Sequence, residues 1–154
     1  MKIEDLLERD EIKLDKQKIK EVNTDKIILV TGAAGSIGSE IVRQLAQYQP
    51  KLLILLDQAE SPLYDLEIEL NDKYKSLHFE VVIGDISDEK RMALLFNTFK
   101  PQMIYHAAAY KHVPMMENNP AEAVRVNIKG TKNIADLAVL NKVEKFVMVS
   151  TDKA

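Results

Sequence analysis

Apolar runs alternate with amphipathic segments along the chain from Lys26 onward. The short apolar runs have the length of buried strands, and the amphipathic segments place apolar residues at helical spacing, so strands and helices alternate. The predicted strands cover residues 27–30, 52–56, 77–83, 103–107 and 145–150. The predicted helices cover residues 36–49, 62–73, a segment around 91–96 that Ser87 or Asp88 caps, and 120–140.

Five apolar strands joined by helices require a parallel sheet that is covered on both faces. Because crossovers between parallel strands are right-handed, the predicted fold class is α/β with a doubly wound parallel sheet. Residues 1–25 carry many charges and few apolar positions, so we expect a lead-in segment there, with a short helix at 3–8 followed by a linker. The domain itself is expected to cover residues 26–154.

The composition limits the classes of function. A chain of 154 residues with 46% hydrophobic residues can bury one good core. The net charge of −3 and the lack of a basic stripe argue against a nucleic-acid partner. The chain has no cysteine, which removes thiolate chemistry, and its three histidines show no ligand spacing, so we expect no metal site. With no apolar run long enough for a membrane span and no signal peptide, we expect a cytoplasmic location.

A glycine-rich stretch follows the first predicted strand. Residues 31–38 are Thr-Gly-Ala-Ala-Gly-Ser-Ile-Gly, and they lead directly into the first predicted helix. Glycine permits a tight turn, close approach of the backbone to phosphates and close packing of helix on strand, while the free amides of a first helical turn attract an anion. The sequence therefore predicts a dinucleotide site of the NAD(P)-binding Rossmann type. The residues expected to bind the cofactor there are Gly32, Gly35, Ser36, Ile37 and Gly38.

The second predicted strand ends in an acidic residue, Asp57. Its distance from the glycines is about the twenty residues at which an acidic side chain binds the adenosine ribose. The charge of Asp57 would repel the 2'-phosphate of NADP, and Gln58 and Ala59 supply no arginine to bind one. We therefore expect Asp57 and Gln58 to bind the cofactor, and we expect NAD in preference to NADP.

The Gly-x-x-Gly-x-x-Gly spacing after Thr31 resembles the short-chain dehydrogenase/reductase superfamily, especially its extended branch. In that superfamily an aspartate at the end of the third strand and the next backbone amide bind the adenine edge, which implies this role for Asp85 and Ile86. Small residues at the end of the fourth strand suit a backbone that lies against the cofactor. The resemblance therefore implies cofactor contacts from Ala107, Ala108 and Ala109.

More specific motifs narrow the resemblance to the nucleotide-sugar 4,6-dehydratases of bacterial surface-polysaccharide, capsule and glycan biosynthesis. Ala-Tyr-Lys-His-Val-Pro at 109–114 and Ser-Thr-Asp-Lys at 150–153 are much more specific than the glycines. Glu8 and Ala59 depart from the usual glycine and serine of these proteins, and neither concerns the chemistry. The similar segments are 3–7, 30–44, 56–60, 105–131 and 150–154.

This resemblance implies a lyase that acts on a UDP-linked N-acetylhexosamine, with UDP-N-acetylglucosamine as the favoured substrate. Hydride leaves sugar C4 for oxidised NAD, the C5 proton becomes acidic beside the new ketone, the C6 hydroxyl is eliminated, and hydride returns to C6. By the family pattern Asp152 is the acid at the C6 hydroxyl, Lys153 is the base at C5, and Thr151 hydrogen-bonds the sugar. Lys111 and His112, on the loop after the fourth strand, are expected to bind the sugar or its diphosphate.

Two residues of the predicted helix 120–140 are poor helix formers, and we expect a structural role for each. The superfamily often uses an asparagine at the position of Asn127 to bond the neighbouring strand backbone. Gly130 costs about 1 kcal/mol relative to alanine in an exposed helix, so we expect it to pack closely against another element.

Two alternatives remain open for the function. A nucleotide-sugar 4-epimerase shares the fold and the cofactor but has no need for Asp152 and Lys153. A non-catalytic NAD-sensing module is the alternative outside the enzymes. The catalytic tyrosine or methionine, the sixth strand and the sugar-binding part of the family would follow Ala154, so we expect a fragment that binds NAD without turnover.

The resemblance also bears on the parent protein. Residues 3–15 resemble the segment that joins membrane-spanning and accessory regions to the catalytic domain in long forms of these enzymes. We therefore expect the parent to be anchored at the inner face of a membrane, with no membrane contact by this fragment. The complete enzyme is expected to be a homo-oligomer.

Overall fold

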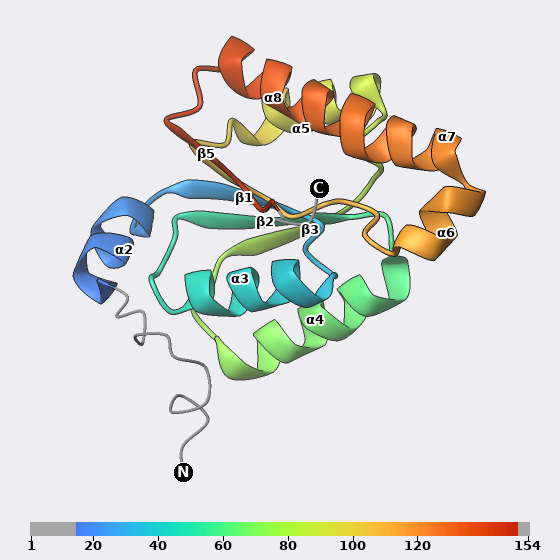
Figure 1. The fold of residues 1–154 in the computed structure, drawn as a ribbon. Helices are drawn as coiled ribbons and strands as arrows, with labels where there is room; N and C mark the ends of the chain where they lie inside the picture. Colours follow the sequence, from blue (N-terminus) through green and yellow to red (C-terminus); the bar gives the residue numbers. More distant parts are fainter. Residues whose placement is uncertain (1–14, 151–154) are drawn as a thin grey trace, which may run out of the picture.

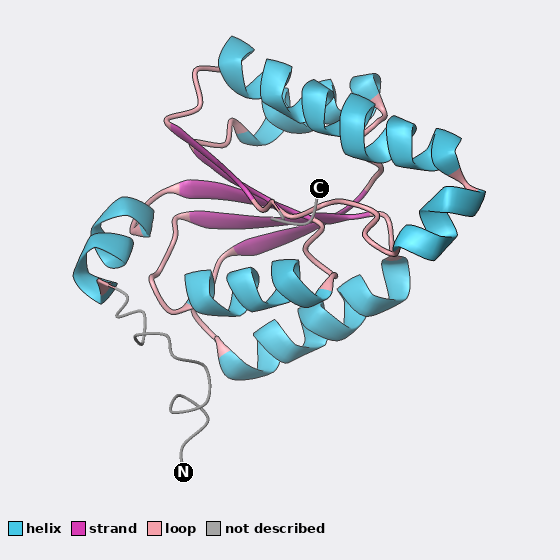
Figure 2. Cartoon of the chain, in the orientation of Figure 1, coloured by secondary structure: helices cyan, strands magenta, loops and turns pink. Residues whose placement is uncertain are grey.

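The computed structural model describes residues 15–150, which form a five-stranded parallel sheet with helices on both faces (Figure 1, Figure 2). The strand order is β3-β2-β1-β4-β5, and each neighbouring pair is parallel. The strands are β1 (Ile27–Thr31), β2 (Leu52–Asp57), β3 (Phe79–Ile83), β4 (Met103–His106) and β5 (Lys145–Met148). The helices are α2 (Lys16–Asn23), α3 (Ser36–Ala46), α4 (Glu60–Lys73), α5 (Glu89–Phe99), α6 (Val113–Asn118), α7 (Pro120–Ala123), the π-helix η1 (Val124–Gly130) and α8 (Thr131–Leu140).

Two layers of helices cover the sheet. In Figure 1, α3 and α4 lie on one face, whereas α5 and α8 lie on the other. The chain changes faces after β3, so β4 pairs with β1 rather than with β3. The switch point of this doubly wound sheet therefore lies between β1 and β4. The predicted α/β fold of the Rossmann type is confirmed.

Alternate side chains of the central strands fill two separate cores. In β1, Ile28 and Val30 join the cluster that α3 and α4 complete, whereas Leu29 joins the cluster that α5 and α8 complete. All three side chains are fully buried, because successive strand residues point to opposite faces and both faces are covered. Each such side chain contributes about 1.5–3 kcal/mol by burial. The cores thus hold the strand ends, where the loops of the site begin, in fixed positions.

The strands agree with the sequence prediction, with ends that move by at most two residues. The first predicted helix ends three residues early, at Ala46, and the second begins at Glu60. The helix predicted over 120–140 is confirmed, since α7, η1 and α8 follow one another without a break over residues 120–140. Its middle part, η1, is a π-helix, which the sequence does not indicate, because a π-helical turn holds an extra residue without changing the apolar pattern clearly. α6 was not predicted, although Pro114 in its first turn suits a helix start.

The lead-in segment contains a helix, α2, where the sequence analysis placed a linker. Asp15 caps α2, because its carboxylate accepts a hydrogen bond from the amide of Lys18 (3.1 Å). At the other end Asn23 is buried, and its Oδ1 accepts a hydrogen bond from the hydroxyl of Tyr105 in β4 (2.9 Å). α2 is therefore tied to the sheet. The helix predicted at residues 3–8 lies outside the described residues.

None of the helices within residues 15–150 combines the length and the apolar character that a bilayer crossing requires.

Candidate functional site

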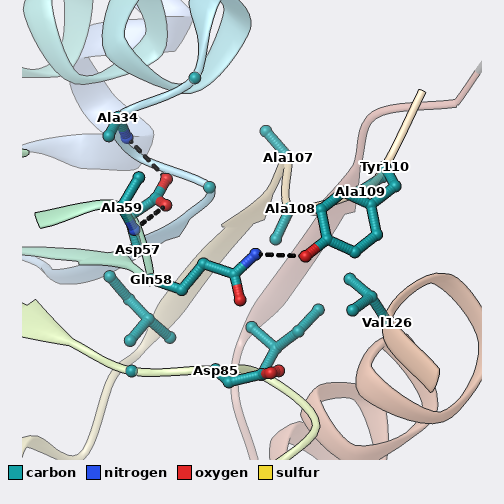
Figure 3. A pocket seen from close by; sticks show the side chains of 15 residues that line it. Ala34, Asp57, Gln58, Ala59, Asp85, Ala107, Ala108, Ala109, Tyr110 and Val126 are labelled. Carbon is teal, nitrogen blue, oxygen red and sulfur yellow. Dashed lines mark hydrogen bonds between the residues drawn. The ribbon is translucent and has the colours of Figure 1, made fainter. Parts of the chain in front are cut away.

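A cavity of about 240 Å³ lies at the carboxyl ends of β1, β2, β3 and β4. Doubly wound sheets bind ligands at this edge, beside the switch point. The structure brings nine of the predicted cofactor-binding residues into the cavity wall, namely Gly32, Gly35, Asp57, Gln58, Asp85, Ile86, Ala107, Ala108 and Ala109 (Figure 3). The wall also contains residues that the sequence analysis did not select, namely Ala34, Leu56, Ala59, Gly84, Tyr110 and Val126.

The turn after β1 leaves no room for a side chain at two of its glycines. Gly32 has a φ of +67°, and a Cβ atom on it would lie 2.6 Å from the amide nitrogen of Ala108. A Cβ atom on Gly38 would lie 1.9 Å from the carbonyl oxygen of Gly32. Both clashes involve backbone, which cannot rotate away as a side chain can. The turn, the start of α3 and the end of β4 are thus in direct backbone contact.

The first turn of α3 presents backbone amides beside the cavity. Its N-cap residue, Gly35, has no side chain that could satisfy them, and Ser36, Ile37 and Gly38 follow as the first helical residues. These three do not line the cavity wall itself. Amides at the start of a helix have no intrahelical acceptors, and the helix dipole adds partial positive charge. The turn therefore has the chemistry of a phosphate site.

A lysine from the loop after β4 reaches the same turn. The Nζ of Lys111 donates a hydrogen bond to the Oγ of Ser36 (3.0 Å). A side-chain cation is thereby added to the partial positive charge of the helix start, which favours an anionic ligand. His112 follows as the N-cap residue of α6 and is exposed. The structure thus brings Lys111 to the predicted phosphate turn and leaves His112 at the start of the next helix.

Asp57 and Gln58 occupy the cavity wall at the end of β2. The two carboxylate oxygens of Asp57 accept hydrogen bonds from the amides of Ala34 and Ala59, each at 2.9 Å. Asp57 therefore joins the glycine turn to the loop that follows β2. The Nε2 of Gln58 donates a hydrogen bond to the hydroxyl of Tyr110 (2.9 Å), as Figure 3 shows. This bond links the loops after β2 and β4 across the cavity.

Asp85, after β3, has several donors around its carboxylate. Its Oδ1 accepts hydrogen bonds from the amide of Ser87 (2.8 Å) and from the hydroxyl of Ser87 (2.7 Å). Its Oδ2 forms a salt bridge with Arg125 of η1. Burial by itself raises the pKa of Asp85, but the hydrogen bonds from Ser87 and Arg125 outweigh it, so the net pKa is lowered. Asp85 is therefore a carboxylate at neutral pH.

β4 ends in a buried histidine that the sequence analysis did not assign to the site. His106 is 3% exposed, and its two ring nitrogens share hydrogen bonds with the hydroxyls of Thr31 (2.7 Å) and Thr131 (3.0 Å). Burial lowers the pKa of His106 to about 4, so the ring is neutral at neutral pH. The three side chains connect β1, β4 and α8 at the residue that precedes the alanines of the cavity wall.

The π-helix η1 borders the cavity through Val126. Beside it, the Oδ1 of Asn127 accepts a hydrogen bond from the amide of Tyr110 (2.8 Å), and its Nδ2 donates one to the carbonyl of Tyr110 (2.9 Å). The expected backbone bonding by Asn127 is confirmed, although its partner lies in the loop just beyond β4. A Cβ atom on Gly130 would lie 2.6 Å from the Cγ1 of Ile86, so the expected close packing is also confirmed.

The three predicted catalytic residues, Thr151, Asp152 and Lys153, lie outside the described residues. Of the wall residues that sequence reasoning missed, Tyr110 could have been found, because it directly follows the alanines after β4. Val126 could not, because the π-helix that brings it to the cavity has no clear apolar pattern.

Comparison with known proteins agrees with this geometry. Residues 28–154 match the model of a family described as polysaccharide biosynthesis protein. The capsular polysaccharide biosynthesis protein CapD of Staphylococcus aureus is 50% identical over 100% of this chain. The inverting UDP-N-acetylglucosamine 4,6-dehydratase of Campylobacter jejuni is 35% identical over 84% of it. The chain spans only 26% of the first relative's length and 37% of the second's.

Solved structures with the same fold include Pen from Bacillus thuringiensis, with a TM-score of 0.76 at 35% identity over 82% of this chain and 39% of that chain. They also include the UDP-glucose 4-epimerase of Thermus thermophilus in complex with NAD, with a TM-score of 0.67 at 30% identity. That similarity covers 80% of this chain and 37% of the epimerase.

Proposed function

This chain belongs to the polysaccharide biosynthesis protein family, and we propose that it is the NAD-binding part of a UDP-N-acetylhexosamine 4,6-dehydratase. Such an enzyme is a lyase that supplies precursors for bacterial surface polysaccharide or glycan. The observation that carries the proposal is the cavity at the ends of four strands, closed on one side by a glycine turn without room for a Cβ atom. The substrate class, with UDP-N-acetylglucosamine first, is supported by the similarity to the Campylobacter jejuni dehydratase.

The residues of the cavity fit a dinucleotide. The backbone at Gly32 and Gly35 and the first amides of α3 would hold the pyrophosphate, since no side chain blocks their approach. Asp57 would bind the adenosine ribose, while Asp85 and the amide of Ile86 would bind the adenine edge. The alanines after β4 would lie against the cofactor. All four strand ends at the cavity would thus contact the bound NAD.

Charge favours NAD over NADP. Asp57 would face the 2'-position of the ribose, where the phosphate of NADP would be repelled. Among the described residues that line the cavity, none is a lysine or an arginine that could neutralise that phosphate. We therefore propose NAD as the cofactor.

The chemistry of elimination would fall to residues after β5. NAD, when bound, would accept hydride from sugar C4 and return it to C6. Lys153 would remove the C5 proton, Asp152 would protonate the departing C6 hydroxyl, and Thr151 would hydrogen-bond the sugar. As hydride returns to C6, C5 would take up a proton again, which gives the 4-keto-6-deoxy sugar. Asp152 must carry a proton and Lys153 must lack one before the elimination, whereas an ion pair between them would favour the opposite states. We therefore propose that the two side chains face different sugar atoms.

The test is turnover of the full-length protein with UDP-N-acetylglucosamine, with NMR detection of a 4-keto-6-deoxy product. Asp152→Asn and Lys153→Ala should each lower the rate of elimination about 10²–10⁴-fold, which is the range for a lost general acid or base. Lys145→Ala removes an exposed lysine of β5 and is the matched control, with an unchanged rate expected. Near-normal elimination by the Asp152 or Lys153 variant would remove that residue from the mechanism.

The similarity to the Thermus thermophilus UDP-glucose 4-epimerase supports a second candidate, a nucleotide-sugar 4-epimerase. An epimerase would return hydride to C4 and would keep the C6 hydroxyl. The same NMR experiment separates the two functions. A product that is inverted at C4 and still carries its C6 hydroxyl would favour the epimerase.

Two residues that follow β4, Lys111 and His112, would contact the ligands. Lys111 lies at the start of α3 and would meet the diphosphate of the UDP-sugar or of NAD, because it extends the positive charge of that turn. His112 would meet the sugar from the start of α6. We further propose that the complete protein is a homo-oligomer located in the cytoplasm, at the inner face of a membrane in long forms.

A further inference from the structure

A charged cluster connects the cavity wall to the π-helix η1. Arg125 forms salt bridges with Asp85, which lines the cavity, and with Glu122, one turn earlier. Its Nη1 also donates a hydrogen bond to the Oγ of Ser87 (2.6 Å), and its Nε and Nη2 donate to the carboxylate of Glu122. The guanidinium is thus held both by side chains of the loop after β3 and by Glu122 of α7. A planar guanidinium group that donates to several fixed acceptors has little rotational freedom.

The donors around Asp85 leave one acceptor position unused. A carboxylate offers about four lone-pair positions. Two donors from Ser87 occupy Oδ1, and Arg125 occupies one position on Oδ2. The remaining position belongs to Oδ2, the oxygen whose direction Arg125 determines. Asp85 lines the cavity and its side chain is 25% exposed, so its carboxylate is not fully buried against its protein partners.

We propose that Arg125 is a positioning residue for adenine recognition, because it fixes Asp85 so that Oδ2 can accept a hydrogen bond from the exocyclic amine of the base. This inference rests on the proposed binding of NAD. Arg125 itself does not touch the cofactor, and its effect passes through Asp85. Ser87 alone would hold Oδ1 and leave the carboxylate free to rotate about that contact. Loss of Arg125 should therefore weaken the choice between bases more than it weakens binding of the rest of the dinucleotide.

The experiment compares NAD with nicotinamide hypoxanthine dinucleotide, in which an oxo group replaces the adenine amine. Dissociation constants are measured by calorimetry for the full-length wild type and for Arg125→Met. A hydrogen bond to a carboxylate should give the wild type a preference for NAD of about tenfold or more, and Arg125→Met should lower that preference at least about threefold. Arg125→Lys keeps the charge with a single donor group and should give an intermediate preference; it also serves if Arg125→Met does not fold.

Arg43→Met is the matched control. Arg43 pairs with Glu69 and Glu40 on the other face of the sheet, and its side chain is 36% exposed, against 39% for Arg125. This control should keep the wild-type preference between the two dinucleotides. In an Asp85→Ala background, Arg125→Met should change the preference no further, since its effect requires the carboxylate.

The outcomes separate this inference from the proposed function. If the wild type binds neither dinucleotide, the proposed function fails. If it binds NAD but Arg125→Met weakens both dinucleotides equally, Arg125 is merely structural and the inference is overturned. The inference is also overturned if the wild type shows no preference, or if Arg125→Met still changes the preference without the carboxylate of Asp85.

Discussion

Protonation of the buried His106 should destabilise the folded protein as the pH falls below neutrality. Folding places the ring at 3% exposure between the hydroxyls of Thr31 and Thr131. Burial disfavours the charged imidazolium and lowers the pKa to about 4, whereas an unfolded chain leaves histidine near its ordinary value of about 6.5. At a pH between these two pKa values, the histidine of the unfolded state binds a proton, whereas that of the folded state stays neutral. Stability is therefore complete above about pH 6.5 and falls as the pH moves toward 4.

The size of the effect follows from the two pKa values. At pH 5 most unfolded chains carry the proton and few folded ones do, which corresponds to a loss of about 2 kcal/mol relative to pH 7.5. Carboxylates add little in this window. Glu69, whose hydrogen bonds with Arg43 and Lys73 lower its pKa from 4.5 to about 2, loses its contribution mainly below pH 4.5. The interval from pH 7.5 to pH 5 therefore reports mainly on histidine.

Urea unfolding at several pH values measures this loss. His106→Gln retains groups that can bond both threonines but cannot titrate, so its free energy of unfolding should depend on pH about 2 kcal/mol less than that of the wild type over the interval. His78→Gln replaces an exposed histidine and should keep the wild-type dependence. NMR titration of the folded protein gives an independent check. A His106 resonance that titrates near pH 6.5, or equal slopes for wild type and His106→Gln, would refute the reasoning.

Three further changes test the cavity. Gly38→Ala forces a Cβ atom against the carbonyl oxygen of Gly32, so it should lower the free energy of unfolding in urea by about 1–3 kcal/mol and weaken NAD binding. Gly35→Ala is the control and should cost less, because its Cβ atom would lie 3.3 Å from that same oxygen. Equal losses for the two variants would contradict the clash at Gly38. Asn127→Leu removes both hydrogen bonds to the backbone of Tyr110 and leaves these half-buried backbone groups without a partner. In the same urea experiment the free energy of unfolding should fall by about 1–3 kcal/mol. An unchanged free energy of unfolding would show that water replaces the two lost hydrogen bonds. Asp57→Asn removes the charge that disfavours NADP and should lower the preference for NAD about tenfold in calorimetric titrations with both cofactors; an unchanged preference would assign the discrimination elsewhere.

Local patterns in the sequence were sufficient for the sheet and for the position of the glycine turn. Apolar runs such as 52–56 predict buried strands whatever the position of the strand within the sheet. The reason is that a parallel strand covered on both faces needs apolar side chains on both faces. The glycine requirement is local too, since the turn from β1 into α3 repeats a fixed backbone path. Asp57 was found for the same reason, at a set distance from the glycines.

Only the tertiary structure decided which side chains meet across the cavity. The contacts of Gln58 with Tyr110 and of Asp85 with Arg125 join residues that are far apart in the chain. They depend on the strand order and on the rotational position of η1, which a π-helical turn shifts relative to a regular helix. The periodicity of a segment indicates which of its faces is buried, but it carries no information about the partner on the other side. The chain's own pattern therefore determined the elements and the phosphate turn, and the packing of those elements determined the pairs of polar groups around the cavity.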